Sequence, residues 1–87
     1  MGLHDGHRAR KKALFRQSGL DGFADHEVLE LVLYYAIPRR DTNETAHRLL
    51  QKFGSLQNVF SAPAEELAKV EGVGENAALL LTLLPAA

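Results

Sequence analysis

The chain has 87 residues, which is enough for one small domain and too few for two. Leu and Ala supply 15 and 12 residues, whereas Val, Ile and Thr together supply 9, so the composition favours helices over a sheet. The absence of Cys excludes disulfides, thiolate zinc sites and Cys nucleophiles, and it is typical of a cytoplasmic protein. No apolar run reaches the roughly 20 residues that span a bilayer, so we expect no membrane partner.

The net charge of −1 is divided into blocks. Residues 1–20 carry +4, residues 21–35 carry −4, residues 36–60 carry +2 and residues 61–87 carry −3. A polyanion is therefore expected to bind only locally, at the first or the third block. The pI of about 6.4 argues against a strong general nucleic-acid binder.

Residues 1–24 are predicted to form a basic N-terminal arm. The stretch 7–17 is typical of a weak helix, because its apolar residues are scattered around the helical wheel. Gly19 and Gly22 end it. The alternative is a solvated and partly disordered N-terminus.

The next predicted helix covers about residues 26–36, with Asp25 as its N-cap. Apolar residues cover most of its wheel, so we place it at the centre of the fold. Glu27, Glu30 and Tyr34 share the remaining stripe, which we expect to face solvent.

A turn at Pro38 ends this helix, and Asp41 is predicted to cap a third one, with Glu44 completing a capping box. The inward positions of the third helix follow the spacing i, i+3, i+4 and i+7: Ala46, Leu49, Leu50 and Phe53.

Two short helices follow. Gly54 stops the third helix, and Ser55 is predicted to cap a fourth. Pro63 opens a fifth helix, in which Ala64, Leu67 and Ala68 face inward.

A last helix is predicted over about residues 75–84, ending before Pro85. It is apolar on almost every side, and a domain of this size can hardly bury two such helices. We therefore expect it to promote self-association or to pack against another domain.

These elements predict an all-α fold of five or six short helices, with residues 25–87 forming a single compact domain. The residues expected at its centre are Leu29, Leu33, Ala46, Leu49, Leu50, Phe53, Leu56, Val59, Phe60, Leu67, Val70, Val73 and Ala78.

The most informative motif is Gly72-Val73-Gly74, followed four residues later by the small Ala78. It looks like a helix–hairpin–helix motif, in which two glycines allow a tight turn and the small residue allows the helices to cross closely. The amides of the turn and of the next helical residues, including Asn76, then point outward and can hold a phosphate. The alternative is an interhelical turn that binds nothing, and Glu75 favours it because a carboxylate repels phosphate.

Further candidate DNA-binding residues are cations outside the hairpin. Arg39 and Arg40 lie in the Pro-initiated turn before a helix, and Arg48 and Lys52 are one turn apart on the exposed side of that helix. The arm adds Arg8 and Arg10. The alternative is an ordinary solvated surface, or pairing of Arg39 and Arg40 with the acidic residues 21–30.

The four histidines and the serines do not form a recognisable catalytic or metal-binding pattern. His4 and His7 flank a glycine, and the sequence offers no third ligand at a telling distance. We therefore expect no metal, no cofactor and no catalytic residue.

The run from Leu49 to Leu84 resembles the tandem helix–hairpin–helix domain of UvrC-type excinucleases, a bundle similar to the SAM and RuvA C-terminal domains. Three further stretches sharpen the match: His4-Asp5-Gly6-His7-Arg8-Ala9-Arg10, the run 25–31, and the run 35–43 from Tyr35-Ala36-Ile37-Pro38 onward. Together they resemble the N-terminal region of the RadC family, the UPF0758 proteins, over essentially the whole chain.

The resemblance implies a part of a DNA repair-associated protein whose C-terminal portion is a JAB/MPN-like metal domain. The glutamate and the His-x-His…Asp zinc constellation of that domain have no counterpart in this sequence. We therefore expect a non-enzymatic domain that binds the DNA phosphate backbone weakly and without sequence preference. The alternative is a protein-interaction or dimerisation module without DNA binding, including one that docks on the JAB-like domain.

Overall fold

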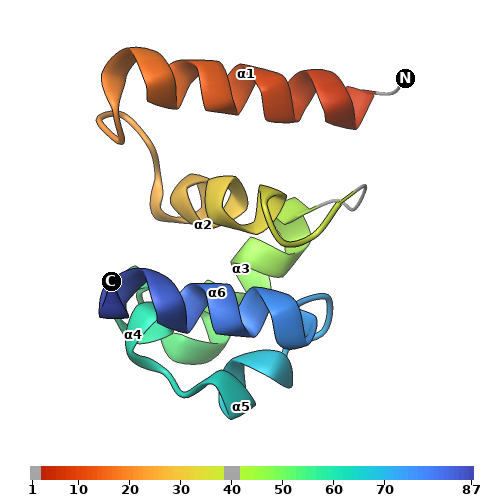
Figure 1. The fold of residues 1–87 in the computed structure, drawn as a ribbon, viewed down its shortest axis with the longest axis vertical. Helices are drawn as coiled ribbons and strands as arrows, with labels where there is room; N and C mark the ends of the chain where they lie inside the picture. Colours follow the sequence, from red (N-terminus) through yellow and green to blue (C-terminus); the bar gives the residue numbers. More distant parts are fainter. Residues whose placement is uncertain (1–2, 39–41) are drawn as a thin grey trace.

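The computed structural model describes residues 3–38 and 42–87, and within them it contains six α-helices and no strand (Figure 1). The helices are α1 (Leu3–Ser18), α2 (Asp25–Tyr34), α3 (Thr42–Phe53), α4 (Leu56–Ser61), α5 (Ala64–Ala68) and α6 (Gly74–Ala86). The all-α prediction is confirmed. None of the described helices combines the length and the apolar character needed to cross a membrane.

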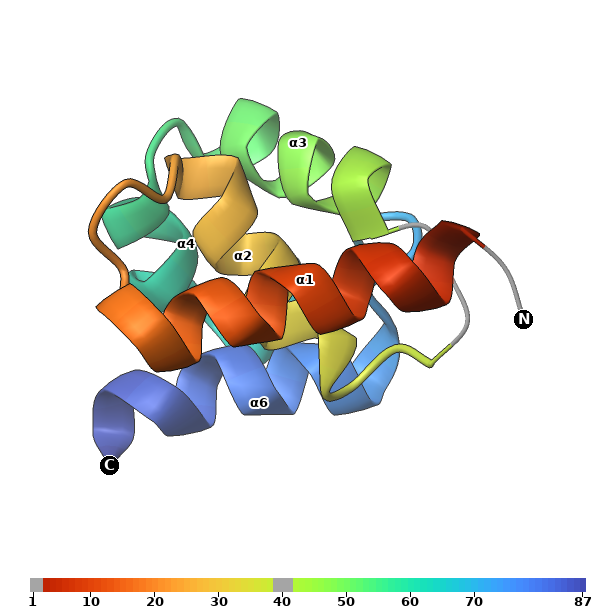
Figure 2. The ribbon, with the colours of Figure 1, turned by 90° about the horizontal axis from the view of Figure 1, so that it is seen from above.

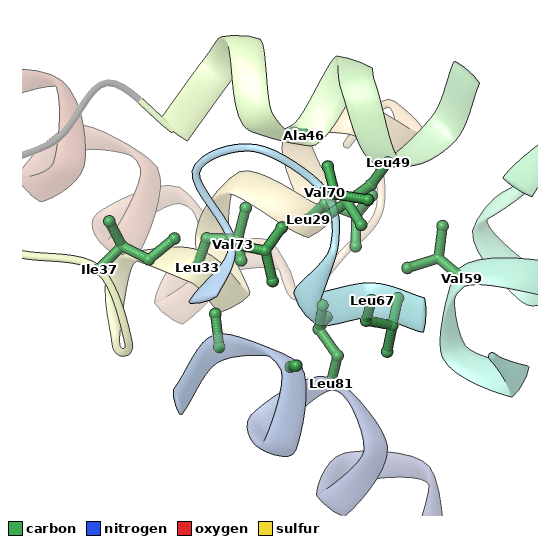
Figure 3. Close-up of a cluster of buried hydrophobic side chains, with 12 residues drawn as sticks. Leu29, Leu33, Ile37, Ala46, Leu49, Val59, Leu67, Val70, Val73 and Leu81 are labelled. Atoms are coloured by element: carbon green, nitrogen blue, oxygen red, sulfur yellow. The ribbon is translucent and has the colours of Figure 1, made fainter. Parts of the chain in front are cut away.

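The core lies between α2, α3 and the C-terminal helices. Leu29 and Leu33 of α2 are fully buried and point toward side chains of α3 and of the α5–α6 segment (Figure 3). The buried cluster consists of Leu29, Leu33, Ile37, Ala46, Leu49, Val59, Leu67, Val70, Val73, Ala77, Ala78 and Leu81. Helix α2 is therefore central, as its nearly uniform apolar wheel predicts.

Four residues expected at the centre lie at its edge instead. Leu50, Phe53, Leu56 and Phe60 are only partly buried and pack against the cluster from outside. Leu56 and Phe60 line an open apolar hollow, so one side of each ring or branch stays accessible. Three residues that the prediction did not include, Ile37, Ala77 and Leu81, are buried in the cluster.

Side-chain oxygens accept hydrogen bonds from backbone amides at the N-termini of α4 and α2. Ser55 Oγ accepts a hydrogen bond from the Asn58 amide at 3.1 Å, which confirms the predicted N-cap of α4. At α2 the N-cap is Ala24 rather than Asp25, and Glu27 Oε1 accepts from the Ala24 amide at 2.9 Å. Because the glutamate reaches back to the cap, the helix begins without a side-chain acceptor at the cap position itself. The predicted cap Asp41 lies outside the described residues.

Two predictions about the C-terminal helices are wrong. Helix α6 runs through Pro85 to Ala86, because a proline near the end of a helix removes only one hydrogen bond. The Ala87 amide closes the last turn by donating to the Leu83 carbonyl at 2.9 Å and the Leu84 carbonyl at 3.3 Å. In the short α5, Leu67 is buried but Ala68 is exposed, since a five-residue helix presents only one turn to the core.

The polar stripe of α2 is covered by α1 rather than by solvent. Glu30 is 2% exposed and Tyr34 is 6% exposed, so the prediction of a solvated stripe is wrong. Helix α1 contacts this side of α2 through cations: Lys11 pairs with Glu27, and the Arg8 guanidinium lies 4.7 Å from the centre of the Tyr34 ring. Apolar periodicity does not reveal a contact of this kind, because both surfaces are polar.

Candidate nucleic-acid interface

The turn between α5 and α6 is a tight hairpin that depends on its two glycines. Gly72 and Gly74 have φ angles of +93° and +71°, a region that side chains other than glycine rarely adopt. The Val73 amide donates to the Val70 carbonyl at 3.1 Å, and the Val73 side chain is buried, as the sequence predicts. A Cβ at Gly72 would collide with the Thr45 hydroxyl, so this glycine also allows α3 to approach the turn.

The hairpin presents the first residues of α6 to solvent. Gly74, Glu75 and Asn76 are exposed, whereas Ala77 and Ala78 are buried against the core. Val73, the N-cap residue of α6, makes no side-chain capping hydrogen bond. The first amides of a helix lack intrahelical acceptors, so this end offers donors to an anion.

The structure brings the Pro38 turn next to this hairpin. An open hollow of about 450 Å³ is lined by Ala36, Ile37 and Pro38 on one side and by residues 72–76 on the other. Two segments that the sequence singles out independently are thus neighbours in space. Arg39 and Arg40, which follow Pro38 directly, lie outside the described residues.

Arg48 lies at the side of the hairpin that faces α3. Its guanidinium donates to the Glu71 carbonyl at 3.4 Å and forms an ion pair with Glu44 at 3.2 Å. The side chain remains about one-third exposed, at 37%. Arg48 therefore adds positive charge beside Gly72, although part of that charge is balanced by Glu44.

Lys52 lies one helical turn further along α3 and is exposed. Its ammonium group is 5.4 Å from the centre of the Phe53 ring. A hydrogen bond from Lys69 lowers the pKa of the Glu66 carboxyl, and the charge of Lys52 lowers the same pKa further, so Lys52 lies within reach of α5. Each of these two cations of α3 therefore has an acidic side chain near it: Glu44 is beside Arg48, and Glu66 is near Lys52.

The two arginines predicted in the arm have different surroundings. Arg8 donates to the Tyr34 carbonyl at 3.1 Å and to the Ile37 carbonyl at 2.7 Å, which fixes it at the C-terminus of α2. Arg10 is exposed. Of the two, only Arg10 presents an open guanidinium surface in this arrangement.

The neighbouring Lys11 makes the principal ion pair between α1 and α2. Lys11 donates to Glu27, and this hydrogen bond, aided by the Ala24 amide, holds the pKa of the Glu27 carboxyl below its ordinary value. The side chains are 12% and 29% exposed, so the pair is partly shielded from solvent. Part of the positive charge of the arm is therefore used to attach α1.

Two histidines that the sequence does not link, His26 and His47, are in contact. The rings of His26 and His47 stack with their centres 4.5 Å apart, joining the first turn of α2 to α3. No periodic signal links two residues so far apart in the chain. Within the described part of the chain, no group of three or more His, Asp or Glu side chains is placed to hold a metal ion.

Comparison with known proteins assigns the chain to a family. No family model matches it, and no solved structure matches it either. A UPF0758 protein of Fusobacterium nucleatum subsp. nucleatum is 48% identical over 81 residues, which cover 93% of this chain and 35% of that protein. A UPF0758 protein of Ruegeria pomeroyi is 44% identical over 80 residues, which cover 92% of this chain and 36% of that protein. The chain thus spans about a third of the length of these relatives, and it belongs to the UPF0758 family.

Proposed function

We propose that the surface formed by the α5–α6 hairpin, the Pro38 turn and Arg48 binds the phosphate backbone of duplex DNA weakly and without reading its sequence. The observation that carries the proposal is the hollow between Pro38 and residues 72–76, beside the uncapped N-terminus of α6. Helix N-termini bind phosphate through their amides and the helix dipole. Contacts of this kind position a duplex but carry no base information.

The charges around the hollow support weak binding. Arg48 supplies positive charge beside the Glu71 carbonyl, Lys52 lies one helical turn further along α3, and Arg39 and Arg40 follow Pro38 in the chain. Glu75 is exposed at the first turn of α6, and Glu44 pairs with Arg48. Only a few phosphates can be neutralised by such a set, so we expect a Kd of ~10⁻⁴–10⁻⁶ M near physiological salt.

In this proposal the chain is a non-enzymatic, cytoplasmic part of a DNA repair-associated protein of the RadC type. Membership of the UPF0758 family and the glycine hairpin both support this role. The tandem helix–hairpin–helix relationship belongs to the same proposal. It rests on the two glycine-containing turns, at Gly54 and at Gly72–Gly74, each of which joins two helices.

The experiment is fluorescence anisotropy with a labelled duplex, beginning at ~20 mM salt, where the Debye length is ~20 Å. The slope of log K against log salt should be about −2 to −4, since each neutralised phosphate contributes about −0.9. Replacing Arg39 and Arg40 together by Ala should make that slope shallower by about 2, equally for all DNA sequences. A chain that binds no duplex at ~20 mM salt contradicts the proposal.

Two variants locate the binding surface. Glu75→Lys should tighten binding, and Asp21→Lys is its matched control, because Asp21 makes the same charge change in the α1–α2 loop at the opposite end of the molecule (Figure 1). Gly74→Val should abolish binding by covering the amides and should destabilise the fold by ~1–3 kcal/mol, because its φ of +71° strains a side chain even though a Cβ there meets open space. A folded Gly74→Val variant that binds DNA normally excludes the hairpin as the site.

The second candidate function is a protein-interaction module without DNA binding. It is favoured by one specific observation: Tyr35, Leu79 and Leu83 are large apolar residues that remain exposed on one side of the molecule.

A further inference from the structure

The outer surface of α6 carries no charged residue after its first turn. From Asn76 to Ala87 the sequence contains neither an acid nor a base. Leu81 points into the core, whereas Leu79 and Leu83 are 53% and 60% exposed. The Thr82 hydroxyl donates to the Leu79 carbonyl of its own helix at 2.9 Å, so its hydrogen is already paired. This surface therefore loses little polar hydration when it is covered.

Two apolar hollows border this helix and share the residues Tyr35 and Leu80. One hollow, of about 730 Å³, extends over Leu79 and Leu83. The other, of about 750 Å³, runs between α6 and α1 and includes Phe15, Leu20, Val28, Leu31, Val32, Leu56, Phe60, Leu84 and Pro85. We call this continuous surface the α6 face. Helix α6 runs along one edge of the molecule in Figure 2, and in Figure 1 the level of α2 lies between those of α1 and α6. Contiguous exposed apolar surface of this kind marks an interaction site.

The two ends of the α6 face carry opposite charges. Glu75 is exposed at the N-terminus of α6, and Arg16 is exposed in the last turn of α1. The last turn of α1 and the C-terminus of α6 lie on the same side of the molecule in both views, with α1 at a different level along the long axis in Figure 1 (Figures 1 and 2). Arg16 follows Lys12 by one turn, and Lys12 lies 4.7 Å from the centre of the Tyr35 ring, so Arg16 continues the basic rim of the face. Neither Glu75 nor Arg16 belongs to an ion pair within the described residues.

We propose that the α6 face binds a second copy of this chain, with the two α6 helices antiparallel about a two-fold axis. An antiparallel arrangement brings Glu75 of each copy to the Arg16 end of the other, which forms two equivalent ion pairs. It also places the positive N-terminal end of each helix dipole beside the negative C-terminal end of the other. A parallel arrangement brings like charges together at both ends. Isologous contacts of this type close into dimers rather than growing into filaments.

A second copy of the chain is favoured over other binding partners, because it matches both the apolar centre of the α6 face and the opposite charges at its two ends. A strongly acidic or basic partner matches only one end. Leu79, Leu83 and Leu84 lie along α6 away from the hairpin glycines, whereas Glu75 borders both the α6 face and the hollow of the proposed DNA surface, so the dimer is tested without DNA and its first variant is made at Leu83.

The experiment is sedimentation velocity on the 87-residue chain without DNA. The protein concentration runs from about 10 µM to about 1 mM, which covers the dissociation constants expected of a small interface. We expect a monomer–dimer equilibrium. Leu83→Glu should raise the dimer Kd at least tenfold, whereas Leu14→Glu should leave it unchanged. Leu14 is the matched control because it is 49% exposed on α1 and borders neither hollow. Circular dichroism should show the same helix content for both variants, since both residues are exposed.

A charge exchange tests the antiparallel orientation. Glu75→Arg and Arg16→Glu should each weaken the dimer, and the double variant should restore most of the loss. A chain that is monomeric throughout the range overturns the proposal, and so does a dimer that Leu83→Glu leaves intact. A dimer that is weakened by both single charge changes but not restored by the double variant overturns the antiparallel arrangement.

Discussion

Helix α1 and the α2–α6 bundle are held by different kinds of contact. In the bundle, apolar side chains from α2, α3, α4, α5 and α6 meet in one buried cluster. Helix α1 instead contacts α2 through Arg8 and Lys11, while its Leu14 and Phe15 remain exposed. The bundle therefore resists unfolding through burial, and α1 is retained by charge and by hydrogen bonds to carbonyl groups. The difference predicts that the two regions respond to separate perturbations.

The largest effect is expected from Gly72→Ala, which acts on the bundle. The substitution places a side chain at a φ of +93° and against the Thr45 hydroxyl, so it should destabilise the fold by ~2–4 kcal/mol. Gly74→Ala is the control, because its φ of +71° is also strained but its Cβ meets open space, and it should cost only ~1 kcal/mol. Urea denaturation followed by circular dichroism measures both, and equal losses would show that the approach of Thr45 does not matter.

An intermediate effect is expected from Arg8→Gln, which acts on α1. The loss of a charged donor to the Tyr34 and Ile37 carbonyls should weaken the attachment of α1 by ~1–2 kcal/mol. Hydrogen exchange should accelerate in residues 8–18 and stay slow in α3 and α6. Arg10→Gln removes the same charge from an exposed position and should change neither. Uniform acceleration across the whole chain would mean that α1 and the bundle unfold as one unit.

The smallest effect is expected from the Lys11–Glu27 pair. Because the folded pKa of Glu27 lies below its unfolded value, the pair stabilises the chain above the ordinary glutamate pKa of about 4.3. This contribution, of up to about 1 kcal/mol for a partly shielded pair, should disappear as the pH falls through the lower folded pKa. Glu27→Gln should remove that part of the acid dependence of thermal unfolding. An unchanged pH profile in the variant would show that Glu27 contributes nothing to it.

Sequence patterns predicted the bundle well because apolar spacing, glycines and caps are local signals. The inward positions Leu29, Leu49 and Val73 and the Ser55 cap follow directly from such signals. The burial of Glu30 and Tyr34 could not be predicted in this way, because it depends on a polar helix that packs from elsewhere in the chain.

The candidate site was predicted in its parts but not in its arrangement. The hairpin glycines and the Pro38 turn were each recognisable from residue type, yet their proximity follows from the path of α2 and α6 through the core. Arg8 illustrates the opposite case. A basic residue in a basic segment suggests an external anion, whereas here the acceptors are two carbonyls of the same chain.

Arg8 links α1 to the segment that borders the hollow beside the hairpin. Its guanidinium joins α1 to the carbonyls of Tyr34 and Ile37, and Ile37 also forms part of the wall of the hollow beside the hairpin. Whatever ligand fixes that wall also favours the docked position of α1. By thermodynamic linkage, the docking of α1 then strengthens binding in the hollow by the same factor. A helix that makes no contact with a ligand is in this way able to set its affinity.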